Sequence, residues 1–329
     1  MTASTRTVSV LSGGVGAARL LAGLLDAGRH GMIDASITAV VNTADDCVLH
    51  GLAISPDLDT VTYTLAGAID PGRGWGLVDE TWHAMASLER YEAIRPEGST
   101  AAPRWFNLGD RDLATHFYRT ARLAEGATLT EVTDEIRRAW DVPITILPMS
   151  DDRLATIVSV EGDDGQPTDV AFQDYFVRLR HAVAVRSVRF DGAAALADAA
   201  RSAIATADVV VIAPSNPIVS IGPIRSLPGV DDLLARRRAR NVAVSPIVGG
   251  VALKGPADRM LAELGHEPSV IGVAELYAPI AAALVIDPAD AHLAADVEAT
   301  GLRCIVTPSV MATPDIARDL AAATLDAID

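Results

Sequence analysis

The stretch VSVLSGGVGAARLLAGLL, from Val8 to Leu25, governs how the rest of this 329-residue chain is interpreted. Its β-branched start ends at Ser12, three glycines follow within four residues, and an apolar pattern with helical spacing then begins. A strand that runs through such a turn into a helix presents backbone N–H groups and a helix N-terminus, and both suit a phosphate group. We therefore expect a phosphate-binding turn, with a tight turn that holds no ligand as the alternative.

Strands and helices alternate through most of the chain. Residues 35–42 predict the second strand, and continuously apolar runs at 207–215, 241–250, 282–288 and 303–309 predict four more. Such runs are typical of strands buried on both faces, as in a parallel sheet covered by helices. The expected fold is α/β, with a doubly wound, mostly parallel, Rossmann-like sheet that carries helices on both faces.

The middle of the chain does not follow this alternation of strands and helices. From 128 to 190 a helix is followed by short alternating strands and the turn DDGQPTD, a pattern that predicts a small α/β insertion. The Rossmann-like core would then consist of residues 1–127 and 191–329.

Composition and charge narrow the function classes. The net charge of −16 argues against a general nucleic-acid binder, because no basic field is available to neutralise a phosphate backbone, although it does not exclude a nucleotide. The two cysteines, Cys47 and Cys304, lie far apart and form neither a metal-ligand spacing nor a disulfide framework. The N-terminal residues lack the apolar run of a signal peptide, and no stretch reaches membrane-spanning length. These features predict a cytoplasmic protein without membrane or nucleic-acid partners.

The glycine loop departs from two familiar nucleotide-binding patterns. The dinucleotide fingerprint would place Gly or Ala where Arg19 stands, and an acidic residue where the second predicted strand ends in Asn42 and Thr43. The Gly-Lys-Ser/Thr ending of a P-loop is absent as well. An NAD(P)-dependent oxidoreductase is therefore disfavoured.

Four aspartates follow the second predicted strand: Asp45, Asp46, Asp57 and Asp59. They lie at or just beyond its carboxyl end, which is where ligands bind in open α/β sheets. Mg²⁺ favours one or two carboxylates, with phosphate and water as its other ligands. Aspartate also begins helices, and SPDLDT is equally typical of a helix N-terminus. His50, within the same stretch, could orient a carboxylate or simply be packed.

Three later loops have polar or glycine-rich sequences. The loops at 213–224 and 245–257 follow predicted buried strands and offer side-chain and main-chain donors, among them Asn216 and Ser220. In WFNLGDRDLATH, Arg111 stands between two aspartates at a predicted helix start, where anion binding and a structural role are equally plausible.

Taken together, LSGGVGAARL, NTADD, HGLAISPDLDTVTY, WFNLGDRDLATH, PSNPIVSIGPI and SPIVGG resemble the 2-phospho-L-lactate transferase family of coenzyme F-420 biosynthesis, the CofD/FbiA group. The blocks occur in order over nearly the whole chain. The Ala- and Arg-rich composition is similar to that of actinobacterial members, for which the resemblance implies a phosphoenolpyruvyl donor.

The resemblance implies a Mg²⁺-dependent transferase that is a homodimer. Such an enzyme moves a phosphoenolpyruvyl or 2-phospho-L-lactyl group from a GDP-activated donor to the ribityl hydroxyl of the deazaflavin Fo and releases GMP. The sequence leaves the choice between the two acids open. Distant relatives that share the glycine loop and an NTADD-like motif are non-catalytic, nucleotide-sugar-binding metabolic regulators. That alternative is disfavoured here by SPDLDT and NLGDRDLATH.

The resemblance also assigns residue roles within a core that would bind nucleotide and deazaflavin. The expected catalytic residues are Asp45, Asp46 and Asp57, with Asp46 or Asp57 orienting the attacking hydroxyl, and the expected metal ligands are Asp45 and Asp59. The residues expected to bind substrate are Gly14, Val15 and Gly16 at the phosphates, Asn216, Ser220, Ile221, Gly222 and Gly249 around the nucleotide, and Asn42, Thr43, His50, Gly109, Asp110 and Arg111 around the deazaflavin.

Overall fold

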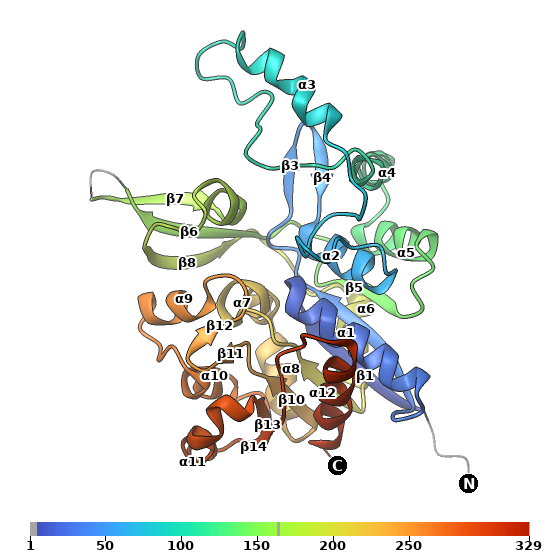
Figure 1. The fold of residues 1–329 in the computed structure, drawn as a ribbon, viewed down its shortest axis with the longest axis vertical. Helices are drawn as coiled ribbons and strands as arrows, with labels where there is room; N and C mark the ends of the chain where they lie inside the picture. Colours follow the sequence, from blue (N-terminus) through green and yellow to red (C-terminus); the bar gives the residue numbers. More distant parts are fainter. Residues whose placement is uncertain (1–4, 163–164, 329) are drawn as a thin grey trace.

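The computed structural model describes residues 5–162 and 165–328. Its centre is a seven-stranded parallel sheet with the order β14-β13-β10-β9-β1-β2-β5 (Figure 1). In a doubly wound sheet successive strands are added first toward one edge and then toward the other, and here that change occurs between β1 and β9. The order confirms the predicted α/β fold. The seven strands are β1 (Arg6–Ser12), β2 (Ala35–Val41), β5 (Thr145–Pro148), β9 (Val209–Ile212), β10 (Asn241–Val244), β13 (Ala283–Ile286) and β14 (Arg303–Val306).

Helices cover both faces of this sheet. Along β9, Val209 and Val211 point into one core, and Val210 and Ile212 point into the other, because side chains alternate along a strand. The first core is shared with α1 (Gly14–Arg29), α2 (Pro56–Leu65) and α12 (Pro314–Asp326). The second core is shared with α6 (Asp198–Thr206), α7 (Gly222–Ser226), α8 (Val230–Arg236), α9 (Ala257–Glu263), α10 (Val270–Tyr277) and α11 (Ala294–Ala299).

A projection rises from the end of β2 at the top of Figure 1. It consists of the hairpin of β3 (Cys47–Leu49) and β4 (Leu52–Ile54), followed later in the chain by α3 (His83–Glu92). Ile54, Met85 and Leu108 form its small core. The chain then returns to the sheet through α4 (Asp112–Ala124) and α5 (Leu129–Ala139).

The range 128–190 is divided between two sheets. Strand β5 pairs with β2 in the central sheet. The strands β6 (Ala155–Glu161), β7 (Pro167–Ala171) and β8 (Val185–Asp191) form a separate antiparallel sheet, with the π-helical turn η1 (Asp174–Arg178) beside it. Residues 163 and 164, at the start of the predicted turn DDGQPTD, lie outside the described residues. The proposed domain division itself stays a prediction.

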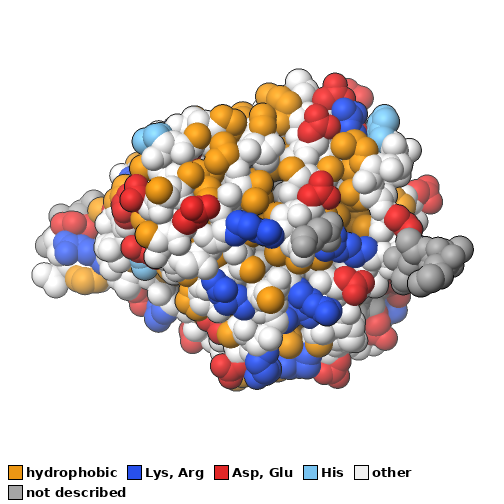
Figure 2. Space-filling view, turned by 90° about the horizontal axis from the view of Figure 1, so that it is seen from below, with side chains coloured by type: hydrophobic (Ala, Val, Ile, Leu, Met, Phe, Trp, Pro, Cys, Tyr) orange, Lys and Arg blue, Asp and Glu red, His pale blue; other side chains and the backbone are white. Residues whose placement is uncertain are grey.

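Short elements complete the fold. After the carboxyl ends of β9, β10 and β13 come η2 (Pro217–Ile221), β11 (Ile247–Val248), β12 (Val251–Ala252) and η4 (Pro288–Leu293), whereas η3 (Arg238–Arg240) directly precedes β10. Among the described helices, none combines the length and the apolar character that crossing a bilayer requires. In the view from below, acidic and basic side chains are interspersed on the surface (Figure 2).

Candidate functional site

A cavity of about 910 Å³ lies at the carboxyl ends of the strands, where the strand order reverses. Ligands bind at this switch point in doubly wound sheets. The loops after β1, β2, β9, β10 and β14 all contribute to its wall. The 73–76 and 105–107 loops, η1, the loop between β12 and α9, and residues of α2 and α4 also line it.

The glycine loop, residues 13–16, packs closely against the loop that follows β9. A Cβ atom on Gly16 would lie 2.1 Å from the Pro214 carbonyl oxygen, and one on Gly13 would lie 2.6 Å from Ser220 Cβ. The Ser215 hydroxyl fastens the two loops, since it donates to the Gly13 carbonyl at 2.7 Å and accepts from the Gly13 N–H at 3.2 Å. Helix α1 therefore begins at the cavity, and no hydrogen bond from the Gly13 position caps its first turn.

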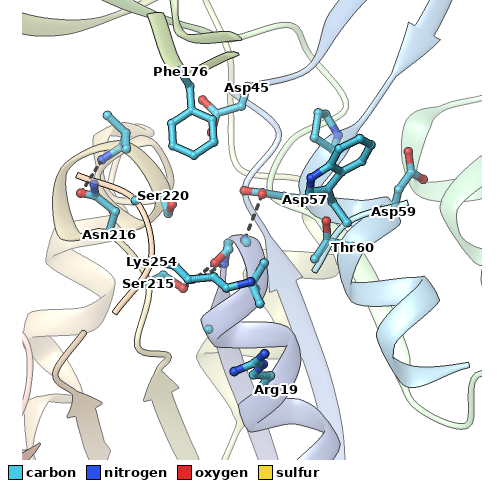
Figure 3. A pocket seen from close by; sticks show the side chains of 18 of the residues that line it. Arg19, Asp45, Asp57, Asp59, Thr60, Phe176, Ser215, Asn216, Ser220 and Lys254 are labelled. Carbon is cyan, nitrogen blue, oxygen red and sulfur yellow. Dashed lines mark hydrogen bonds between the residues drawn. The ribbon is translucent and has the colours of Figure 1, made fainter. Parts of the chain in front are cut away.

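Two carboxylates meet beyond this helix N-terminus (Figure 3). The Asn42 side-chain N–H₂ donates to Asp45 Oδ2 and to Asp57 Oδ2, both at 3.0 Å, and Gly14 N–H donates to Asp57 Oδ1 at 2.9 Å. Asp45 Oδ1 is buried and accepts no hydrogen bond of good geometry, although the Thr156 hydroxyl is near enough to oppose the rise in the Asp45 pKa. The pair therefore has acceptor capacity that the described residues do not satisfy.

The electrostatics of this acid pair favour a cation. Burial raises the pKa of Asp45 well above its usual range, and the neighbouring Asp57 raises it further. Burial also raises the pKa of Asp57, to about 6, although the hydrogen bonds from Asn42 and Gly14 oppose the shift. A divalent cation between the two would stabilise both charged forms, and paired carboxylates are the usual protein contribution to a Mg²⁺ site.

This shift predicts a pH dependence of stability in metal-free protein. The folded-state pKa of Asp57 is about 6 and the unfolded-state value is about 3.9, so the folded state binds the proton more tightly. Stability should therefore fall as pH rises through roughly that window. Denaturant midpoints measured in EDTA at both ends of the window should show this loss in the wild type and a smaller loss in Asp57→Asn. An equal loss in the two proteins would contradict the assignment.

Asp59 lies in a different network. It forms a two-fold ion pair with the buried Arg119, and one of its hydrogen bonds measures 3.2 Å from Arg119 Nη1 to Asp59 Oδ2. His116 lies between this pair and Asp112, with its Nε2 3.2 Å from Asp112 Oδ2, and Tyr63 donates to Asp112 at 2.6 Å. The atoms of Asp59, Asp112 and His116 are close enough to hold a metal. The Arg119 charge beside Asp59, however, already supplies the cation there.

Aromatic side chains form two walls of the cavity. Trp75, Trp105 and Phe106 line one part, and the stacked rings of Phe172 and Phe176, whose centroids are 5.5 Å apart, line another. Such rings provide flat apolar surfaces for a planar ligand. None of these residues was predicted from the sequence, in which the aromatics at 105–117 favoured a core position. A tryptophan between two glycines at 74–76 is a sequence signal that could have indicated one of them.

The sequence model of the family described as 2-phospho-L-lactate transferase CofD matches residues 8–307. The chain belongs to the CofD family. It is 42% identical over 318 residues to the phosphoenolpyruvate transferase of Kitasatospora aureofaciens, a match that covers 94% of this chain and 95% of that protein. It is 41% identical to the phosphoenolpyruvate transferase of Mycobacterium avium strain 104, with 97% of each chain covered. A solved structure, protein BH3568 from Bacillus halodurans, shares the fold with a TM-score of 0.61 at 19% identity and covers 99% of both chains.

The resemblance drawn from the sequence blocks is thereby confirmed, and the chain is a transferase of the CofD family. Within this CofD-family fold, only some of the predicted site residues reach the cavity. Those that line it are Gly14, Val15, Gly16, Asp45, Asp57, Asp59, Asn216 and Ser220.

Two predicted residues support the site from behind the cavity wall. Asn42 holds the acid pair together through its side-chain amide. Asp46 accepts a 2.6 Å hydrogen bond from Ser55 and is not among the residues that line the cavity, and burial raises its pKa well above its usual range. Its predicted role at the attacking hydroxyl stays a prediction.

The remaining predicted residues lie outside the cavity lining and make structural contacts. Asp110 accepts from the backbone of His83 and Ala84 at the start of α3, and Arg111 donates to the Val78 carbonyl at 2.6 Å. Others outside the lining are Thr43, His50, Gly109, Ile221, Gly222 and Gly249. Their predicted substrate contacts find no support in this arrangement and stay predictions.

Proposed function

We propose that this CofD-family chain transfers a phosphoenolpyruvyl group, or alternatively a 2-phospho-L-lactyl group, from a GDP-activated donor to the ribityl hydroxyl of the deazaflavin Fo, with release of GMP. One observation carries the proposal. A single cavity combines the first turn of helix α1, an acid pair in which Asp45 Oδ1 accepts no hydrogen bond, and flat aromatic walls. These features match a diphosphate, a divalent cation and a planar ring system. The relatives named phosphoenolpyruvate transferases favour the phosphoenolpyruvyl donor.

Asp45 and Asp57 would hold the Mg²⁺ in this proposal. Their shared hydrogen-bond donor brings them together, and the orphaned Asp45 Oδ1 offers a buried ligand atom. Bound there, Mg²⁺ would offset the negative charge of the diphosphate. The earlier assignment of Asp59 as the second ligand is less well supported, because Arg119 already neutralises Asp59.

The chain's own residues would mainly position the reactants. The first turn of α1, with Val15 and Gly16 in the cavity wall, would hold phosphate oxygens through main-chain N–H groups. The aromatic walls would fix the planar ring so that the ribityl hydroxyl faces phosphorus. The oxygen–phosphorus bond forms as the bridging bond to GMP breaks, GMP leaves with the electron pair, and the hydroxyl proton is released. Positioning and electrostatic stabilisation are sufficient for such a transfer, so no covalent intermediate with the chain is needed.

Mass spectrometry of the product tests this function. Incubation of the protein with Fo, Mg²⁺ and each activated donor in turn should yield a phosphorylated three-carbon acid joined to Fo, together with GMP. Fo binding, followed in parallel by its fluorescence, separates the enzyme from the regulator alternative, because a regulator should neither bind Fo nor form product. Absence of product with both donors, despite saturating Mg²⁺, would overturn the proposal.

A further inference from the structure

Lys254 is the only lysine in the chain. Of the 27 lysines and arginines in the sequence, every residue except Lys254 is arginine. The single ammonium group directs attention to this position. The two groups differ in size and hydrogen-bond geometry, since the ammonium is a compact point charge and the guanidinium is a broad planar fork.

The surroundings of Lys254 explain a size requirement. It lies in the loop between β12 and α9, in the wall of the cavity. Its Nζ is 2.5 Å from the point that a Cβ atom on Gly74 would occupy, and that same point is 3.8 Å from the Val15 methyl groups. The ammonium therefore packs against the bare backbone of the 73–76 loop, next to the first turn of α1. A broader head group would crowd that loop.

A second cation lies one helical turn beyond Val15. Arg19 also lines the cavity, and its guanidinium donates a long hydrogen bond of 3.4 Å to the Met311 carbonyl. Figure 3 shows Lys254 reaching across the first turn of α1, with Arg19 further along the helix and Asp57 beyond its N-terminus. Burial lowers the pKa of Lys254, and the like charge of Arg19 lowers it further.

Neither cation has an acidic partner within residues 5–162 and 165–328, although the chain carries an excess of 16 negative charges. Arg73, the third cation in the cavity wall, is different. It pairs with Asp70 at 3.1 Å and lies over the rings of Trp75 and Trp82. Arg73 is therefore already neutralised, whereas Lys254 and Arg19 are exposed to the cavity and are available to an anionic ligand.

We propose that Lys254 and Arg19 form the subsite that binds the diphosphate of the donor and holds the phosphate of the departing nucleotide. This inference rests on the proposed function. A phosphate held by the first-turn N–H groups of α1 would lie between the acid pair, with its cation, and these two side chains. Negative charge grows on the departing phosphate as the bridging bond breaks, and fixed cations at that point stabilise it. Three N–H donors on one ammonium allow Lys254 to contact more than one phosphate oxygen.

Amine labelling tests the occupant directly, because a lysine-reactive acylating reagent can modify only Lys254 and the N-terminal amine. Inorganic diphosphate and GDP should each slow acylation of Lys254 about tenfold or more and leave the N-terminal amine unaffected, as read by peptide mass spectrometry. Pyruvate and lactate at the same concentrations should give no protection. Protection by these acids alone would identify a carboxylate as the occupant and overturn the proposal.

Calorimetric titration with GDP in EDTA tests the two side chains. Lys254→Gln and Arg19→Gln should each weaken GDP binding about tenfold or more, the size expected for a lost charged hydrogen bond. Lys254→Arg should fail to restore the affinity, since charge alone does not meet the size requirement. Arg29→Gln, at the far end of the same helix, removes the same charge away from the cavity and should bind GDP as the wild type does.

The outcomes separate this inference from the function on which it rests. If the wild type binds neither GDP nor diphosphate even when Mg²⁺ replaces the EDTA, the proposed function fails. If the wild type binds GDP and the Lys254 and Arg19 variants bind it equally well, only the assignment of this subsite is overturned.

Discussion

Replacing Asp45 or Asp57 by Asn should lower the rate of transfer about 10³-fold while the protein stays folded. Each change removes one carboxylate from the pair that would hold Mg²⁺, and a catalytic metal contributes several kcal/mol of charge stabilisation in the transition state. A loss of about 4 kcal/mol corresponds to roughly 10³ in rate. Asn keeps the shape of the side chain, so the Asn42 position between Asp45 and Asp57 should be kept.

Stability gives this prediction a second readout. Burial disfavours the charged form of both carboxylates in metal-free protein and raises the pKa of each, and the charge of Asp57 raises the pKa of Asp45 further. Each single substitution should therefore leave the denaturation midpoint in EDTA unchanged or raise it, while the stabilisation by added Mg²⁺ disappears. A residue that only maintained the fold would show the opposite result, with stability and activity lost together.

Asp326→Asn is a matched control, because Asp326 is an exposed aspartate at the end of α12, far from the cavity lining. It should match the wild type in rate and in Mg²⁺ dependence. Near-normal turnover by Asp45→Asn and Asp57→Asn at low Mg²⁺ would refute the metal assignment.

The fold was predictable from the sequence because its signals are local. The apolar runs predict strands buried on both faces, and the bare glycines between β1 and α1 predict a close approach of another segment. The structure supplies that segment as the loop after β9, with Pro214 against Gly16. The split of residues 128–190 between two sheets was not predictable in this way, since the pairing of β5 with β2 joins segments about 100 residues apart.

The acidic cluster shows why the site was predicted only in part. Sequence proximity grouped four aspartates, but Asp57 and Asp59 are two residues apart on one helix, and successive helical residues are turned by about 100°. They therefore point to nearly opposite sides, so that Asp57 reaches Asp45 and Asp59 reaches Arg119. The helical spacing was present in the sequence. The partner on α4, 60 residues further along, was not indicated by any local pattern.

Arg119→Met should destabilise the protein by about 3–5 kcal/mol, the cost expected when one member of a buried ion pair is removed and its partner stays charged. Arg119 is 2% exposed, and both of its outer nitrogens donate to Asp59. The double variant Arg119→Met/Asp59→Asn removes the orphaned charge and should recover much of this loss. Denaturant unfolding of the wild type, the single variant and the double variant measures both effects.

A control at an exposed ion pair, together with added Mg²⁺, distinguishes whether Asp59 is an ion-pair partner or a metal ligand. Arg138→Met breaks the exposed pair with Asp134, which spans 2.9 Å, and should cost no more than about 1 kcal/mol. If Asp59 belongs to the ion pair, Mg²⁺ should not restore the stability of Arg119→Met, because the acid pair of Asp45 and Asp57 binds the metal in all of these proteins. Selective rescue of Arg119→Met by Mg²⁺ would instead mean that a cation replaces the guanidinium beside Asp59, Asp112 and His116. That result would mean that Asp59 can bind Mg²⁺, and that Arg119 and the metal compete for its carboxylate.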